Sequence, residues 1–410
     1  MRLYVFIIIS LVIVSCSKPE ITNPIDQLKA DVALLASDSL EGREVGTIGE
    51  DKAAAYLASR LKNLGLEPKG TDGYLQAFYV NKSNNPHEKE SISSKDSLGG
   101  IAGENVIGYI NNPGDEIIIL GAHFDHLGYG GLSSLYRGDS AIHNGADDNA
   151  SGTAALLYLA EELLKKPIQR DVMILAFSGE EKGLWGSNYF SKNPTIDLEK
   201  VDYMINMDMI GRLDTAKGIA IHGVGTAPNW SEEIDQANTF NLKVIKKESG
   251  VGPSDHTSFY LQDIPVLHYF TGQHEDYHRP SDDVDLINFE GIKTVADHIL
   301  NVVRSLEDQP KLAFQKTKDE SKSGPKFTVT LGVVPDYMFD GKGVRIDGVS
   351  EDKPAQKAGL VKGDVVVQLG DSTVTDMMSY MRALSSFSSG DKTVVKVKRD
   401  KEELAFDIQF

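Results

Sequence analysis

The sequence predicts an α/β protein with a mostly parallel, twisted sheet that carries helices on both faces, followed by a second, smaller domain. Two observations predict this class. Apolar segments of strand length alternate with helical patterns through most of the chain, which is typical of a parallel sheet covered by helices. Near residue 307 the composition turns polar and charged, and a chain of 410 residues has room for two domains.

Helical and strand patterns follow one another in a definite order. Residues 25–66 carry apolar side chains at helical spacing, and the pattern ends at Gly65, a residue type common at helix ends. The polar stretch NKSNNPHEKESISSKDSLGG has no periodicity and is expected to form a surface loop. Next come the strands NVIGYI and EIIILGAHFD, then the helix SGTAALLYLAEELLKK, and then the strands DVMILAF, VDYMINMDMIG and IPVLHYF.

The predicted domain boundaries follow the last long helical pattern, GIKTVADHILNVVRSLE. The main domain is predicted over residues 20–306. Residues 307–325 are polar and interrupted by proline and glycine, so we expect a linker there. The second domain is predicted over residues 326–410.

The amino terminus, MRLYVFIIISLVIVSCSKPE, has the pattern of an export signal. Its apolar run, residues 3–14, is shorter than the about 20 residues that a bilayer-spanning helix needs. The residues IVSC resemble a bacterial lipobox, which implies a signal peptide over residues 1–16 and lipidation of Cys16. The alternative is a free cysteine in an ordinary signal or membrane anchor. We therefore expect an exported lipoprotein, anchored to a membrane on its periplasmic or cell-surface side.

Composition and charge exclude some partners. The chain has 60 acidic and 42 basic residues, for a net charge of −18, which argues against a nucleic-acid binder because phosphates need a basic face. Cys16 is the only cysteine, so the chain has no internal disulfide.

Side chains that bind metals or move protons follow the predicted strands at their carboxyl ends, where ligands bind in such sheets. Burying several carboxylates together costs on the order of several kcal/mol each unless cations compensate them. Divalent metals are the simplest compensation. The candidates are His123 and Asp125, Asp147 and Asp148, Glu180 and Glu181, Asp208, and His278.

Single candidates also have purely structural explanations. Ser178 and Glu181 have the spacing of a capping box, which would leave Glu180 without a role. Asp147 or Asp148 could cap a helix. Taken jointly, two histidines and three carboxylates match a pair of zinc ions about 3.5 to 4 Å apart, although cobalt or manganese would also suit them.

Six motifs together resemble the di-zinc aminopeptidase family, which also contains glutamate carboxypeptidases and glutaminyl cyclases. The motifs are AHFDHLG, GADDNASG, FSGEEKGLWGS, INMDMIG, SDHTSF and DYHRPSDD, in this order. The resemblance covers residues 25–306 and implies a zinc-exopeptidase fold, two zinc ions per chain and peptide substrates.

The resemblance implies a role for each matching residue. Glu180 is similar to the family's general base, which takes a proton from the attacking water, and Asp125 to the acceptor that orients His123. In this family a cis peptide bond follows the bridging aspartate. The implied ligands are His123 and Asp208 for one zinc, Glu181 and His278 for the other, and Asp148 between both.

A substrate pocket beside the metals is expected to include Asp255 and His256 from SDHTSF, with Tyr269 and Phe270. Simple packing near the site explains these four residues equally well.

The second domain resembles a bacterial PDZ domain, most clearly in PAQKAGLVKGDVV. Such domains bind extended peptides by adding a strand to their sheet, with the terminal carboxylate on backbone N–H groups. The matching loop here includes Leu331, Gly332 and Val333. Alternatively, the domain packs on the main domain without binding a peptide.

The function predicted from the sequence is that of an exported, zinc-dependent exopeptidase, most simply an aminopeptidase, with a PDZ module for peptide or protein binding. A carboxypeptidase or a glutaminyl cyclase-like enzyme is the alternative within the family. A non-catalytic PDZ scaffold is the alternative outside enzymes, and the complete ligand set argues against it.

Overall fold

The main domain is built on one large sheet. A computed structural model describes residues 23–81, 91–95, 99–131, 133–317, 329–336, 339, 341–350, 352–375, 377–400 and 402–410. The strand order in the sheet is β3-β2-β4-β6-β5-β7-β10-β8-β9, and β1 pairs with β4. The strands are β1 (Glu67–Pro68), β2 (Leu75–Asn81), β3 (Ser91–Ser93), β4 (Ile101–Ile110), β5 (Ile117–His123), β6 (Asp171–Phe177), β7 (Val201–Met207), β8 (Ile219–His222), β9 (Val244–Lys247) and β10 (Val266–Phe270).

The predicted α/β class is confirmed, and the sheet is mixed. The central strands β6, β5, β7 and β10 are parallel, whereas β2 and β4 pair antiparallel with their neighbours and β8 runs antiparallel to β10. The parallel strands are those joined through helices, since a parallel pair requires a long crossover connection. Their carboxyl ends therefore lie together at one edge of the sheet.

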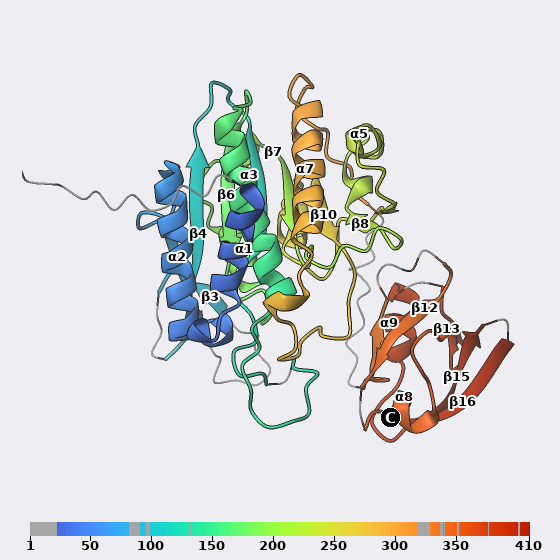
Figure 1. Cartoon of the computed structure of the whole chain (residues 1–410). Coiled ribbons are helices and arrows are strands. Elements are labelled where there is room, and N and C mark those ends of the chain that lie inside the picture. The colour runs from blue at the N-terminus through green and yellow to red at the C-terminus, as the bar shows by residue number, and fades with distance from the viewer. Residues whose placement is uncertain are drawn as a thin grey trace, which may run out of the picture.

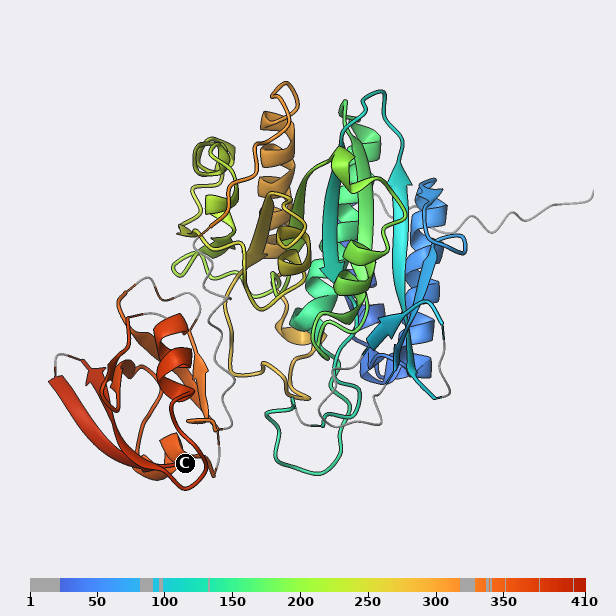
Figure 2. The same ribbon diagram turned by 180° about the vertical axis from the view of Figure 1, so that it is seen from behind.

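Helices cover both faces of this sheet, as Figures 1 and 2 show from opposite sides. The helices α1, α3, α5 and α7 pack with the apolar core of one face. The other face is covered by α4 and α6, whose Phe190 and Phe259 join a second apolar cluster. The helices of the main domain are α1 (Pro24–Leu35), α2 (Ile48–Leu64), α3 (Gly152–Lys165), α4 (Trp185–Lys192), α5 (Trp230–Ala237), α6 (His256–Tyr260) and α7 (Phe289–Ser305).

The segment predicted as helical over residues 25–66 is broken between α1 and α2 by a short 3₁₀ segment, Asp38–Arg43. Arg43, at its end, is completely buried and has a positive φ of 50°. Its guanidinium donates hydrogen bonds to the carbonyl oxygens of Phe124 and Asn144, and of Leu35. Arg43 thus joins α1 to the two loops that follow β5 and precede Asp148.

The C-terminal domain has its own apolar core, formed by residues between Val329 and Ile408. Its sheet has the order β11-β12-β13-β15-β16, with β14 paired to β13, and all of these pairs are antiparallel. Its elements are β11 (Val333–Pro335), β12 (Val344–Val349), α8 (Pro354–Ala358), β13 (Val365–Leu369), β14 (Ser372–Thr373), α9 (Met377–Leu384), β15 (Lys392–Arg399) and β16 (Glu402–Gln409).

The predicted linker is described only as far as Thr317, and its first part packs on the main domain. Leu312 is buried in the same apolar core as α7, and Phe314 packs on Tyr260. The predicted signal peptide and Cys16 lie outside the described residues. Among the residues that are described, no helix is both long and apolar enough to cross a membrane.

Candidate metal centre

The first pair of candidate ligands comes from two neighbouring parallel strands. His123 is the last residue of β5, and Asp208 directly follows β7. The two strands pair along their length, so both side chains reach the same edge of the sheet. The Nε2 atom of His123 lies 3.3 Å from Oδ1 of Asp208.

Asp148 lies between two histidines. Its Oδ1 is 3.4 Å from Nε2 of His123, and its Oδ2 is 3.2 Å from Nε2 of His278. Asp147 points elsewhere, because its Oδ1 accepts hydrogen bonds from the backbone N–H of Gly211 and from Ser151. The other oxygen of Asp147, Oδ2, lies 3.1 Å from Nε2 of His274. The structure thus directs Asp148, and not Asp147, toward His123 and His278, and the peptide bond after Asp148 is cis, as expected.

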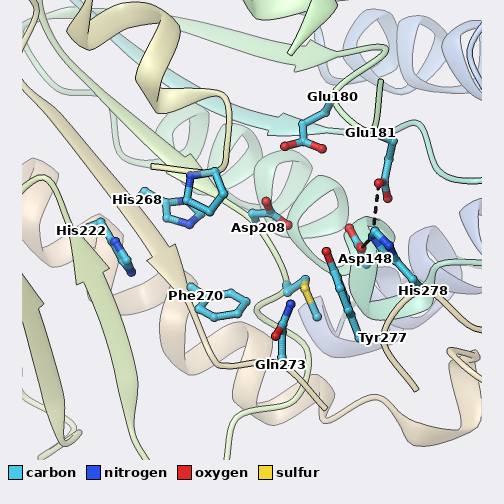
Figure 3. Close-up of a pocket in the computed structure, with 12 residues that line it drawn as sticks. Asp148, Glu180, Glu181, Asp208, His222, His268, Phe270, Gln273, Tyr277 and His278 are labelled. Carbon is cyan, nitrogen blue, oxygen red and sulfur yellow. Dashed lines mark ion pairs between the residues drawn. The ribbon is translucent and has the colours of Figure 1, made fainter. Parts of the chain in front are cut away.

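Glu181 completes the second group of candidate ligands. Its Oε2 lies 3.2 Å from Nε2 of His278, the same distance that separates this nitrogen from Asp148. Figure 3 shows Asp148, Glu181 and His278 converging on one side of a cavity. Burial opposes protonation of His278, but Glu181 and Asp148 outweigh it and raise its pKa to about 11.

These spacings fit zinc. With ligand bonds of about 2.0 to 2.1 Å, neighbouring corners of a tetrahedron around zinc lie about 3.3 Å apart. The separations of 3.2 to 3.4 Å among the five candidate ligands have this value. Imidazole and carboxylate are also the donors that zinc accepts, so the residues present suit two ions that share Asp148.

Glu180 lies beside the first group and forms no ion pair with any residue that the structure describes. One of its oxygens is within 4.8 Å of ligand atoms of His123 and Asp208. Burial, opposed by His123, raises the pKa of Glu180 well above its ordinary value, and nearby carboxylates add to the rise. A carboxylate whose pKa is raised is a better proton acceptor, which is what a general base needs.

Asp125 holds the turn that carries both glutamates. Its carboxylate accepts hydrogen bonds from the backbone N–H groups of Glu180 at 3.0 Å and Glu181 at 3.4 Å. The distance from its Oδ1 to Nδ1 of His123 is 3.6 Å, longer than a hydrogen bond, and this nitrogen contacts the backbone oxygen of Asp125 instead. The predicted orienting residue thus contacts three site residues.

The capping-box explanation for Ser178 and Glu181 is wrong. Helix α4 begins only at Trp185, so residues 178–184 form a turn and not the first turn of a helix. The Ser178 hydroxyl donates to the buried carboxylate of Glu50 at 2.5 Å. Burial raises the pKa of Glu50 to about 7.

A cavity of about 100 Å³ adjoins the candidate ligands. Of the four residues predicted to line it, only Phe270 does so. Tyr269 points to the opposite face of β10, because side chains alternate along a strand, and its hydroxyl contacts His298. Asp255 and His256 are completely buried behind the wall. The lining residues are Asp148, Glu180, Glu181, Asp208, Met209, His222, Pro253, His268, Phe270, Gln273, Tyr277 and His278.

Sequence reasoning missed several residues near the site. His268 lies two positions before Phe270 in β10, and strand periodicity could have placed both on the cavity face. His222 comes from β8, a strand that the hydrophobic pattern did not reveal. His126, three residues after His123, has its Nδ1 2.8 Å from Oε1 of Glu181. The motif AHFDH contains this histidine, but nothing in it indicates where the ring points.

The predicted carboxylate-binding loop of the C-terminal domain precedes β11. Leu331 is buried, Gly332 has a φ of +79°, and Val333 begins the strand. The carbonyl of Gly332 accepts the N–H of Ser350, and that of Leu331 accepts the N–H of Ala355. The loop is thus held to the remainder of its own domain.

Known proteins with similar sequences support the same interpretation. Residues 105–303 match peptidase family M28, and residues 312–410 match a PDZ domain. Aminopeptidase YwaD of Bacillus subtilis is 24% identical over 56% of this chain and 51% of its own length. Aminopeptidase Y of Saccharomyces cerevisiae is 26% identical over 50% of this chain and 40% of its own length. An uncharacterized protein of Escherichia coli, YfbL, is 27% identical over 49% of this chain and 70% of its own.

Solved structures share the fold. A zinc aminopeptidase from Bacillus subtilis, BSAP, matches 72% of this chain and 96% of its own, with a TM-score of 0.54 and 17% identity. A Zn-dependent exopeptidase from Parabacteroides distasonis matches 68% of this chain and 97% of its own, with a TM-score of 0.54 and 19% identity. Fold, candidate ligands and relatives together define a zinc metallopeptidase, a hydrolase. Over about half of its length the chain is similar to peptidase family M28, and its C-terminal region is similar to a PDZ domain.

Proposed function

We propose that the protein is an aminopeptidase that uses two zinc ions to remove N-terminal residues from peptides. The composition of the cavity carries this proposal. Four carboxylates line the cavity, whereas none of its described lining residues is lysine or arginine. Asp148, Glu181 and Asp208 would bind zinc, which leaves Glu180 as the acidic neighbour of a free α-amino group. The carboxylate of a peptide C-terminus finds no basic side chain among these lining residues. This difference favours an aminopeptidase over a carboxypeptidase.

His123 and Asp208 would hold one zinc, Glu181 and His278 the other, and Asp148 both. Bound there, zinc would supply Lewis acidity toward the scissile carbonyl and the attacking water. The full set of ligands for two metals argues against a one-zinc glutaminyl cyclase and against a non-catalytic scaffold.

Glu180 would move the proton. It accepts a proton from the attacking water and then donates it to the leaving amine, so that one carboxylate serves both steps. Its raised pKa supports both roles. The hydrogen bond from the backbone N–H of Glu180 to Asp125 holds the backbone from which the Glu180 side chain extends. Glu181, turned to His278, remains free for metal binding.

The wall of the cavity away from the carboxylates indicates the substrate side chain. It is formed by His222, His268 and Phe270 (Figure 3). Burial and the nearby Lys247 lower the pKa of His222 to about 4, so that this imidazole is neutral at pH 7. A wall of neutral and apolar groups favours an uncharged first residue in the substrate over lysine or glutamate.

A survey of peptides blocked at either end tests the proposal. N-acetylation should lower kcat/KM on the order of 100-fold, because it removes the charge of the α-amino group that would lie beside Glu180. Amidation of the C-terminus should change kcat/KM by less than about threefold. The opposite pattern, with loss on amidation only, would indicate a carboxypeptidase.

We further propose that the PDZ domain binds an extended peptide or protein C-terminus near Leu331, Gly332 and Val333, and that Cys16 is lipidated after export. The family match over residues 312–410 supports the first proposal, and the lipobox-like residues support the second. A chain with Cys16→Ala that still incorporates a labelled lipid precursor would contradict the second.

A further inference from the structure

His126 is the histidine near the metal ligands that the proposed mechanism does not use. It follows β5 and is completely buried. Its ring packs edge-on against the ring of His278, with centroids 5.8 Å apart. Gly145 approaches it so closely that a Cβ there would lie 2.5 Å from the imidazole. The ring therefore has a fixed position beside the second group of ligands.

The two carboxylate oxygens of Glu181 have different partners. Oε2 lies 3.2 Å from Nε2 of His278, at the spacing of two ligands of one zinc ion. Oε1 lies 2.8 Å from Nδ1 of His126, which is a hydrogen-bond distance and shorter than the about 3.3 Å between two zinc ligands. Nδ1 of His126 is also 3.9 Å from Oδ2 of Asp148, too far for a hydrogen bond.

The other ring nitrogen favours one tautomer. Nε2 of His126 is buried and has no hydrogen-bond partner among the described residues. A neutral imidazole has one proton, and within the described parts of the chain the only acceptor at hydrogen-bond distance is Oε1 of Glu181. The proton therefore belongs on Nδ1, which donates to that oxygen.

We propose that His126 is a positioning residue of the second metal site: its Nδ1–H holds Oε1 of Glu181 and thereby presents Oε2 to the metal. This inference rests on the proposed function, because it assumes two zinc ions. Partners of this kind orient a ligand before the metal arrives, and their loss typically weakens binding about 10- to 100-fold.

Zinc affinity, measured by competition with a chromogenic chelator on the full chain, tests the proposal. His126→Phe keeps a ring but has no donor, and should weaken one of the two sites about 10- to 100-fold while the other is unchanged. His126→Asn, whose amide can reach the place of Nδ1, should stay within about threefold of the unsubstituted chain. His298→Asn is the matched control, because His298 is buried but contacts Tyr269 and Ile234 and no candidate ligand.

Each outcome decides between explanations. Unchanged affinity in His126→Phe, or equal losses in the Phe and Asn variants, overturns the proposed role of the donor. Fewer than two zinc ions on the unsubstituted chain overturns the two-metal proposal, and this inference with it. Should His126→Phe not fold, ¹⁵N spectra of the zinc-loaded chain give the answer directly. A protonated Nδ1 supports the proposal, and a zinc-bound Nδ1 overturns it.

Discussion

The two candidate zinc sites are held by different kinds of structure. In the first, His123 ends strand β5 and Asp208 follows strand β7, so their positions are fixed by paired strands in the middle of the sheet. In the second, Glu181 lies in a turn and His278 in a loop, and His278 has a positive φ of 55°. Asp148 belongs to both.

The surrounding hydrogen bonds show the same difference. The carbonyl of His123 accepts from Thr153 of helix α3, and Asp208 accepts from Ser254. His278 is held by another loop, because its Nδ1 contacts the carbonyl of Ser133 and its own carbonyl accepts the N–H of Leu135. A site built on loops depends on individual side-chain contacts, whereas one built on strands is positioned by the sheet. We therefore expect the second site to be the weaker one.

The largest expected effect concerns Glu180, which is the proposed general base and a ligand of neither zinc site. Glu180→Gln should lower kcat about 10²- to 10⁴-fold, because the amide cannot accept the proton from water. Metal analysis should still find two zinc ions per chain. Loss of zinc from this variant would make Glu180 a ligand of the first site, beside His123 and Asp208.

Removing one histidine from each site tests whether the sites are separable. His123→Ala and His278→Ala should each retain about one zinc per chain after gel filtration. In each variant the unchanged site keeps its own two ligands and the shared Asp148. Elemental analysis measures the zinc, and circular dichroism controls for folding. A variant that retains no zinc would mean that neither site binds its ion without the other. The two sites would then not be separable.

Acid should lower the stability of the fold as well as the binding of metals. His298 contacts no candidate ligand, so its effect on stability can be measured separately from metal binding. Burial lowers the pKa of His298 to about 4 against an ordinary value of 6.5, so its contribution to stability is complete above pH 6.5 and is lost as the pH falls toward 4. Between pH 7 and pH 5 the contribution of His298 to the free energy of unfolding should fall by about 2 kcal/mol. Urea unfolding of the metal-free chain measures it. His298→Asn should show a smaller loss over this range, and an equal loss would assign the effect to other groups.

The smallest expected effect is the order in which the ions leave. With a chelator in excess, the loop-held site should release its zinc about tenfold faster than the strand-held site, giving two phases. His278→Ala, which lacks the loop-held site, should show only the slow phase. A single phase, or survival of only the fast phase in that variant, would contradict the ranking.

The strand-held site was the more predictable one from sequence. His123 and Asp208 end apolar runs, and parallel strands bring their carboxyl ends together whatever the details of packing. Glu181 and His278 were candidates because they follow predicted strands, but their pairing at one zinc was implied only by the family resemblance, because no local pattern fixes how a turn and a loop approach each other. His126 and His222 were not predicted, since ring orientation and a short strand such as β8 depend on tertiary packing.

The domain organisation was predicted in outline, and its exact boundaries stay predictions. A polar composition signalled the end of the main domain after α7. It could not signal that Leu312 and Phe314, two apolar residues in that stretch, pack back onto the domain. Two apolar side chains carry no periodicity, so only the folded structure reveals their partners.

The segment after α7 has a consequence for how the protein can be divided. The hydroxyl of Thr317 accepts the N–H of Gly250 and donates to Tyr260, and the loop that begins at Gly250 leads to Pro253 in the cavity wall. A chain cut at residue 306 would lose these bonds and Leu312 while keeping every candidate ligand. It would still bind zinc, but the loop that carries Pro253 into the cavity wall would lack its hydrogen bond to Thr317. A faithful isolated peptidase domain therefore needs to extend through residue 317.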